Sequence, residues 1–146
     1  MQIPNNSVVL VADGRKSLFF RNAGDGVTPN LAVEDKAEFD NPAHSEQATD
    51  MAGQSMKTRD GRGGSMDEVD FHQQEEDRFA ADMADALRAR ALDGDFEALI
   101  VVAPPKTLGE LRKHYHKEVA KRIVGEVPKD LVKMPVAEIE RILQAQ

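Results

Sequence analysis

Three short apolar segments separated by turn residues open the chain. Ser7–Asp13 is rich in β-branched residues and is followed at once by a glycine, a sequence typical of a strand that ends in a tight turn. Ser17–Asn22 can return beside it as the second strand of a hairpin. Leu31–Phe39 carries more charged residues, which favours a third strand at the edge of the sheet. The pattern therefore predicts a three-stranded antiparallel meander.

The second half of the chain alternates helical and strand-like patterns. Apolar residues recur at helical spacing over Phe71–Leu92, and Gly94 stands where a C-terminal cap is expected. Ala98–Ala103 is apolar without alternation, which is typical of a strand buried on both faces. Three further elements are predicted after it: a helix opened by the capping-box sequence Thr107–Glu110, a strand over Ile123–Val127, and a last helix that begins at Pro135.

This order of elements predicts one α/β domain over residues 1–146. The expected architecture is a mixed five-stranded sheet, in which the three-strand antiparallel meander is followed by α-β-α-β-α with the helices packed on the sheet. The order resembles that of the ribonuclease H-like fold. This is an analogy of topology, and it carries no activity by itself.

The segment from Asp40 to Asp70 breaks the pattern. Its 31 residues include no Leu, Ile, Phe or Tyr and a single Val, so it has too little apolar surface to offset the entropy of ordering itself. We expect residues 40–70 to form a flexible, glycine-containing arm between the third strand and the first helix, with Ser65 and Glu68 capping that helix. The arm is either a connector or a binding segment that orders on contact.

Composition narrows the classes of function. The chain has no Cys, which excludes disulfides, thiol nucleophiles and thiolate metal sites. It contains no run long enough to span a membrane and no N-terminal signal pattern, so we expect a cytoplasmic protein. The net charge is −7 but is uneven: residues 104–146 carry +3 and residues 1–103 carry −10. The acidic total argues against indiscriminate nucleic-acid binding, whereas the positive charge of residues 104–146 leaves room for a local basic patch.

Cationic and glycine residues in three places are the candidates for binding RNA or another partner. They lie in the arm, at the start of the first helix and along the second helix, and they are Arg59, Arg62, Gly63, Gly64, His72, Arg78, Arg112, Lys113, Lys117 and Lys121. The last three step by four and are expected to form one stripe on the second helix, where phosphates could bind. The alternative is an ordinary solvated face, because acidic residues are interspersed.

Four sequence blocks carry a resemblance to a known family. They are His72-x-x-Glu75-x-x-Arg78-Phe79-Ala80, Leu99–Pro105, Thr107–Arg112 and Gly125–Leu131. With them the chain resembles the bacterial host attachment proteins, which are described as required for attachment to host cells. That family is similar to the central domain of archaeo-eukaryotic peptide-chain release factors. The resemblance covers almost the whole chain, and its most specific part runs from residue 71 to residue 131.

The resemblance implies a role for the arm. In the release factors, the corresponding loop carries a Gly-Gly-Gln tripeptide that enters the peptidyl-transferase centre and helps to place the attacking water. Met51–Ser55 keeps one Gly and the Gln, which makes Gln54 the candidate for catalysis on peptidyl-tRNA. Gly61–Ser65 keeps both glycines, with Ser in place of Gln. Neither segment has the full tripeptide, so the resemblance supports the position of the arm more than its chemistry.

Three functions follow as hypotheses. The first is a ribosome- or RNA-associated release-factor-like domain, non-catalytic or weakly catalytic. The second is a protein-interaction module that supports host attachment indirectly, with the arm folding onto a protein partner. The third is a hydrolase, acting on peptidyl-tRNA through Gln54 or as a nuclease through Asp13 and an acidic residue of the first helix. No cofactor, metal or membrane partner is expected, and the sequence does not predict the oligomeric state.

Overall fold

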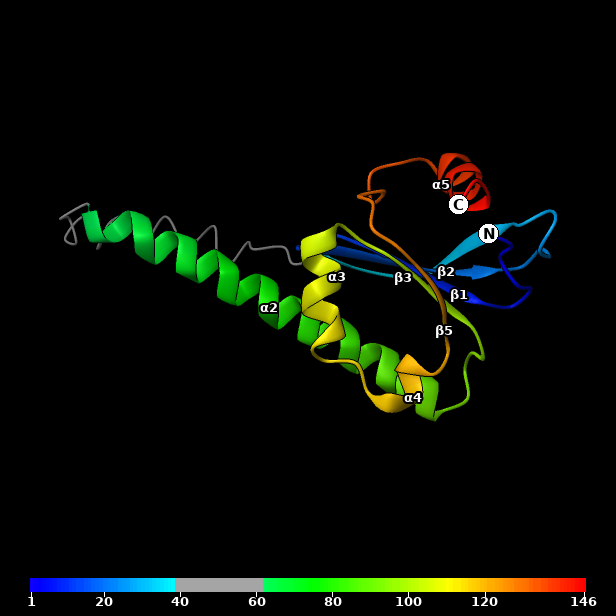
Figure 1. Ribbon diagram of the computed structural model, residues 1–146, viewed down its shortest axis with the longest axis horizontal. Coiled ribbons are helices and arrows are strands. Elements are labelled where there is room, and N and C mark those ends of the chain that lie inside the picture. The colour runs from blue at the N-terminus through cyan, green and yellow to red at the C-terminus, as the bar shows by residue number, and fades with distance from the viewer. Residues whose placement is uncertain (39–61) are drawn as a thin grey trace.

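The computed structural model describes residues 1–38 and 62–146, and for residues 62–70 only the course of the backbone. Five strands form one mixed sheet in the order β3-β2-β1-β4-β5 (Figure 1). The strands are β1 Val8–Ala12, β2 Lys16–Asn22, β3 Leu31–Glu38, β4 Leu99–Val102 and β5 Ile123–Val127. β1 to β3 form the antiparallel meander, and β4 and β5 join β1 in parallel. The predicted mixed five-stranded α/β sheet and the edge position of β3 are confirmed, whereas the ribonuclease H-like class stays a prediction.

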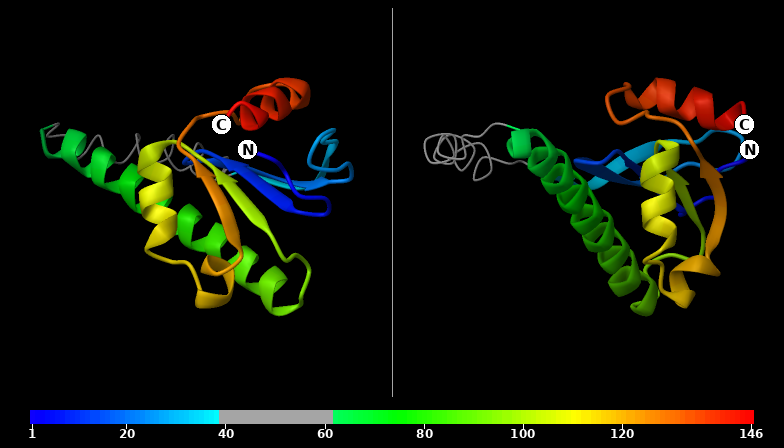
Figure 2. Two further views of the ribbon diagram at one scale, coloured as in Figure 1. Left: turned by 45° about the vertical axis from the view of Figure 1, so that its right-hand side comes forward. Right: turned by 60° about the vertical axis from the view of Figure 1, so that its left-hand side comes forward.

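Helices cover both faces of the sheet, as Figure 2 shows. They are α2 Arg62–Leu92, α3 Pro105–Arg112, α4 Lys117–Ala120 and α5 Val136–Gln144. α2, α3 and α4 pack on one face through Phe79, Leu87, Leu108, Leu111 and Val119. α5 packs on the other face through Ile139 and Leu143. Every residue of β1 and β4 is buried, which explains why these strands are apolar without alternation.

The first helix begins earlier than its apolar pattern predicts. α2 starts at Arg62, nine residues before Phe71, so residues 62–70 of the expected arm are helical and Ser65 cannot cap the helix. Packing of the second half of α2 on the core offsets the free energy of nucleating the helix. Extending the helix into the preceding polar sequence then costs little free energy per residue. The remainder of the expected arm, up to residue 61, lies outside the described residues.

The predicted second helix is two helices. α3 ends at Arg112, and α4 begins at Lys117 after the side chain of His116 accepts a hydrogen bond of 3.0 Å from the Glu118 amide. α3 is entered through Pro104, and its Thr107 side chain is buried in the first turn. The predicted capping box at Thr107 is therefore wrong, because the helix begins two residues earlier.

The C-terminal end of α2 depends on Gly94. Its φ is +71°, and its amide bonds to the Ala91 carbonyl while the Asp95 amide bonds to the Arg90 carbonyl. This is the left-handed cap that the sequence predicts. A Cβ at Gly94 meets nothing within 4 Å, so the strain of an Ala would come from the backbone alone.

We expect Gly94→Ala to lower the free energy of unfolding by about 1 kcal/mol, because L-residues are disfavoured at this φ. Gly109→Ala is a matched control: Gly109 lies inside α3, and a Cβ there also meets nothing. That change should raise stability by about 0.5–1 kcal/mol. Denaturant unfolding of both variants checks the pair, and equal effects of the same sign would contradict the assignment of the cap.

A network of four charges ties β2 and β3 to the end of α2. Arg21, whose side chain is 15% exposed, pairs with Glu34 at 3.0 Å and with Asp95 at 2.9 Å. Arg90 pairs with the same two carboxylates and lies over the Phe19 ring at 5.0 Å. The hydrogen bond from Arg21 holds the pKa of Glu34 below its ordinary value.

We expect Glu34→Gln to lower the free energy of unfolding at neutral pH by about 1–2 kcal/mol, because it leaves two arginines short of a carboxylate. A carboxylate whose pKa is lowered on folding stabilises the protein above its unfolded pKa of about 4.3, and this stabilisation is lost as pH falls through the folded value. The difference between wild type and variant should therefore begin to shrink below about pH 4 and vanish only when the pH falls below the lowered pKa of Glu34 in the folded protein. Glu97→Gln, at an exposed carboxylate without an ion pair among the described residues, is the control and should leave the free energy of unfolding at neutral pH nearly unchanged.

Candidate functional site

Four of the five strands that the structure describes end on the same side of the sheet, the edge that lies across the strand ends. β1, β4 and β5 are parallel, and β3 runs in the same direction because it is antiparallel to β2. All four strands end at this edge, which we call the C-terminal edge. The chain leaves it after β3 and returns through α2, whose first half extends beyond the sheet (Figure 1). In α/β sheets such an edge is the usual place for binding residues.

Five cationic side chains lie along the C-terminal edge without an ion pair among the described residues. We call them the cation row: Arg15, Lys16, Lys36, Lys129 and Lys133. Arg15 and Lys16 belong to the β1–β2 turn. Lys36 of β3 lies beside Leu18 of β2, and Lys129 and Lys133 follow β5. All except Lys16 are exposed, so the row is available to a ligand.

Acidic groups at the same edge are partly engaged by the backbone. The Asp13 carboxylate accepts hydrogen bonds from the amides of Arg15 at 2.8 Å and Lys16 at 2.7 Å, which fixes the β1–β2 turn. Glu38 and Asp130 are exposed and reduce the positive field. The edge is therefore a mixed surface with an excess of free cations, and it is not a uniformly basic patch.

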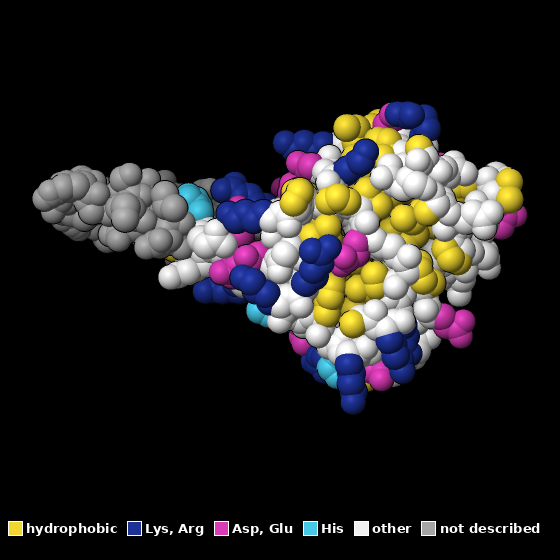
Figure 3. Space-filling model, in the orientation of Figure 1, with side chains coloured by type: hydrophobic (Ala, Val, Ile, Leu, Met, Phe, Trp, Pro, Cys, Tyr) yellow, Lys and Arg dark blue, Asp and Glu magenta, His cyan; other side chains and the backbone are white. Residues whose placement is uncertain are grey.

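The part of α2 that crosses this edge, which we call the root, comprises residues 73–78. Glu75 is 12% exposed and pairs with Arg78 at 3.2 Å. Glu76 lies on Gly14 of the β1–β2 turn, where a Cβ would come within 3.0 Å of its Oε2 atom, and it pairs with Lys106 at 3.5 Å. Figure 3 shows cationic and acidic side chains gathered around the place where α2 leaves the body.

Asp77 faces α3. The pKa of Asp77 is lowered, chiefly by its interaction with the neighbouring Glu110 side chain, and the Gln73 amide, which donates to its Oδ1 atom at 3.1 Å, acts in the same direction. Glu110 is 15% exposed and lies 3.2 Å from the Lys113 ammonium. The root of α2 is thus bound to α3 by polar side chains.

The sequence-predicted residues of the arm fall mostly outside the described part of the chain. Gln54 and Arg59 lie outside the described residues, and Arg62, Gly63 and Gly64 form the backbone of the first turn of α2. His72 and Arg78 are both exposed on α2, as expected for the root of the arm.

The predicted basic stripe is wrong in its geometry, because its members do not share one helix. Lys113 caps α3 and Lys117 opens α4, while Lys121 caps α4. Most of the predicted cations here are also paired: Arg112 with Glu126 at 2.6 Å, Lys113 with Glu110 and Lys121 with Glu118 at 3.0 Å. Their role in binding stays a prediction, and the cation row is the set that sequence reasoning missed.

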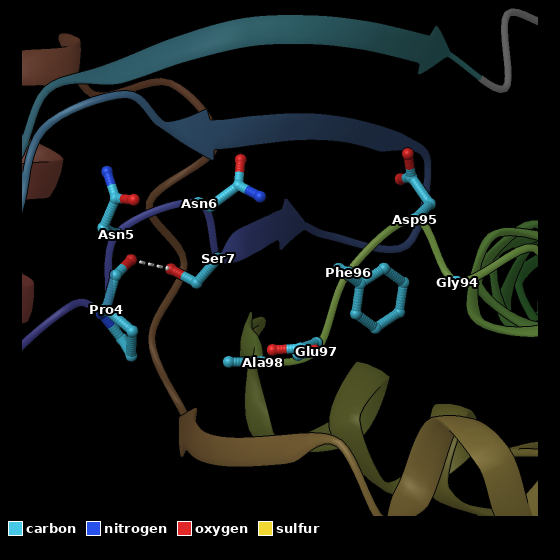
Figure 4. Close-up of a pocket in the computed structure, with 9 residues that line it drawn as sticks. All are labelled: Pro4, Asn5, Asn6, Ser7, Gly94, Asp95, Phe96, Glu97 and Ala98. Atoms are coloured by element: carbon cyan, nitrogen blue, oxygen red, sulfur yellow. Dashed lines mark hydrogen bonds between the residues drawn. The ribbon is translucent and has the colours of Figure 1, made fainter.

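A hollow of about 380 Å³ lies at the opposite edge of the sheet. Residues 4–7 and 94–98 line it, and Figure 4 shows the Ser7 hydroxyl turned back to the Pro4 carbonyl, to which it donates at 2.7 Å. Asp95 at its rim is already paired with Arg21 and Arg90. The polar groups here largely satisfy one another, so this hollow is the weaker candidate site.

The described residues contain neither a metal-binding group nor a membrane-spanning helix. No group of three or more His, Asp or Glu side chains in residues 1–38 and 71–146 is placed to hold a metal ion. Within the part of the chain that the structure describes, no helix has the length and apolar character needed to cross a membrane.

The match to a family model decides the relationship. Residues 6–143 match the model described as bacterial archaeo-eukaryotic release factor family 12. The chain belongs to this family. The matched range spans the whole sheet, the residues between β3 and α2, and all but the last residue of α5. The release-factor part of the resemblance is therefore confirmed, and a link to host attachment is not part of the family description.

Two further comparisons add detail on this family 12 protein. No curated protein matches it. Among solved structures it is similar to the crystal structure of an archaeal translation termination factor, at 12% sequence identity and a TM-score of 0.49. The similarity covers 96% of this chain and 36% of that one, so the chain spans about a third of the length of the archaeal factor.

Proposed function

We propose that this family 12 protein is a release-factor-like domain that associates with the ribosome or with structured RNA in the cytoplasm. In this proposal the C-terminal edge holds the RNA backbone while the residues between β3 and α2 contact the same target. The observation that carries the proposal is the coincidence of the cation row with the edge at which the chain leaves β3 and returns through α2.

The dimensions of the edge suit a phosphate backbone. Neighbouring strands lie about 4.8 Å apart, so the distance from β3 to β5 is about 19 Å. Side chains spread over that width can meet several phosphates of one RNA. Bases would be read poorly: the chain has no Trp, and its single Tyr packs against the core. We therefore propose contacts to phosphate and sugar more than to bases.

We expect the triple variant Lys36→Ala, Lys129→Ala, Lys133→Ala to bind ribosomal RNA more weakly at low salt. Removing one phosphate contact should reduce the slope of log affinity against log salt by about 0.7–0.9. Fluorescence anisotropy at several salt concentrations measures both quantities, and co-sedimentation with ribosomes extends the result to the assembled particle.

A matched control removes the same charge elsewhere. Arg88 and Arg141 are exposed and lie away from the C-terminal edge, on the second half of α2 and near the end of α5 beside Met1. Their double alanine variant, compared with the double variant Lys36→Ala, Lys129→Ala, should keep the wild-type salt slope. Equal reductions of affinity in both variants would contradict a site at the C-terminal edge and would indicate a general electrostatic effect.

A protein partner is the second candidate, favoured by the mixed charge of the edge, where Glu38 and Asp130 accompany the cations. Such a surface also suits a peptide with both signs of charge. In this proposal the protein supports host attachment indirectly. Wild-type RNA affinity in the cation-row variant, together with loss of a captured protein partner, would favour it.

Catalysis on peptidyl-tRNA is not needed for either proposal, because the Gly-Gly-Gln tripeptide is incomplete in Met51–Ser55. We expect wild type and Gln54→Ala to release the peptide from peptidyl-tRNA at equal, near-background rates. A single-turnover assay with ribosome-bound peptidyl-tRNA makes the comparison, and a lower rate in Gln54→Ala would instead assign Gln54 to the reaction.

A further inference from the structure

Three consecutive carboxylates at the root of α2 all have partners. Successive helical residues point in directions about 100° apart, so three neighbours in sequence cannot all face the same partner. Glu75 pairs with Arg78 within α2, and Asp77 accepts a hydrogen bond from Gln73 of the same helix. Glu76 is held from outside the helix, by Lys106 of α3.

α3 is well anchored in the body. It follows β4 through Pro104 and buries Leu108 and Leu111 in the core between the sheet and α2. Arg112 at its end is bound to Glu126 of β5 by a two-pronged contact at 2.6 and 3.1 Å. The position of α3 is therefore set by the sheet, and its polar side chains present fixed partners to α2.

Among the side chains of α2 that the structure describes, the buried apolar ones begin at Phe79, directly after the root in the sequence. Phe79, Ala80, Met83 and Leu87 are buried, and at the root Glu76 pairs with Lys106 of α3. Glu76 adds a third element, because its carboxylate rests on Gly14 of the β1–β2 turn. At the root, α2 is thus held to α3 and to the β1–β2 turn through a charged side chain.

We propose that α3 is a brace for the root of α2, with Glu76 as the positioning residue that fixes the direction in which the helix leaves the sheet. This inference rests on the proposed function, since it assigns the brace the task of presenting the first half of α2 to a target. The fold itself does not depend on the brace, because the packed half of α2 is held by the core.

Hydrogen exchange of the root tests the brace without any ligand. In Lys106→Glu a carboxylate replaces the ammonium opposite Glu76, and the amides of residues 73–78 should exchange roughly two- to tenfold faster. The charge-swapped variant Glu76→Lys, Lys106→Glu restores the attraction and should return exchange toward the wild-type rate. Unchanged exchange in Lys106→Glu, or no recovery in the swapped variant, would overturn the proposal.

Arg141→Glu provides the control. It reverses a cation of α5 that faces Glu138, on the far side of the sheet from α2, and it should leave exchange at residues 73–78 unchanged. Amides of residues 80–91 should be protected alike in all variants, because their part of α2 is packed on the core. None of these measurements involves RNA, so the brace and the RNA proposal can fail separately.

Discussion

The parallel pairing of β1 with β4 is the constraint on which the rest of the structure depends. Both strands are buried over their whole length, so both faces of the sheet must be covered. A parallel pair also needs a crossover, and here it contains β2, β3 and the long helix α2. The same pairing brings the ends of four strands to one edge. Packing of the core and the position of the candidate site therefore have one cause.

Charged side chains form ion pairs at one end of the sheet, whereas the cation row at the other end has none among the described residues. At the end where β1 and β4 begin, Arg21 and Arg90 are bound to Glu34 and Asp95 and join three elements. At the C-terminal edge, the five cations of the cation row have no ion pair among the described residues. Ion pairs in the first group stabilise the fold, whereas exposed unpaired cations contribute little to stability and remain free to meet an anion. This contrast, more than the net charge of −7, is the reason for proposing that the C-terminal edge binds RNA.

The fold was largely predictable because its signals are local. The apolar run at β4, the turn after Asp13 and the cap at Gly94 each depend on a few neighbouring residues, and each is confirmed. The break between α3 and α4 was not predictable from helical spacing, because it depends on a side-chain cap at His116 and on the burial of Val119. The early start of α2 was missed for a related reason: an apolar pattern reports packing, and a helix can continue beyond its packed part.

The candidate site was harder to predict than the fold because its members are distant in sequence. Lys36 and Lys129 look like isolated surface residues until the strand order places both at the C-terminal edge. The stripe Lys113, Lys117 and Lys121 had the stronger sequence signal, yet two of its three members are paired with neighbouring glutamates. A useful signal was nevertheless present, since Arg15, Lys16 and Lys129 each follow a predicted strand within four residues. Cations that directly follow parallel strands lie on the same side of the sheet, because these strands all end there. In this member of the release-factor-like family, positive charge without an ion pair among the described residues therefore lies beside the point where the chain leaves β3. The topology of the sheet thus supports a binding role for this edge independently of whether Gln54 takes part in any reaction.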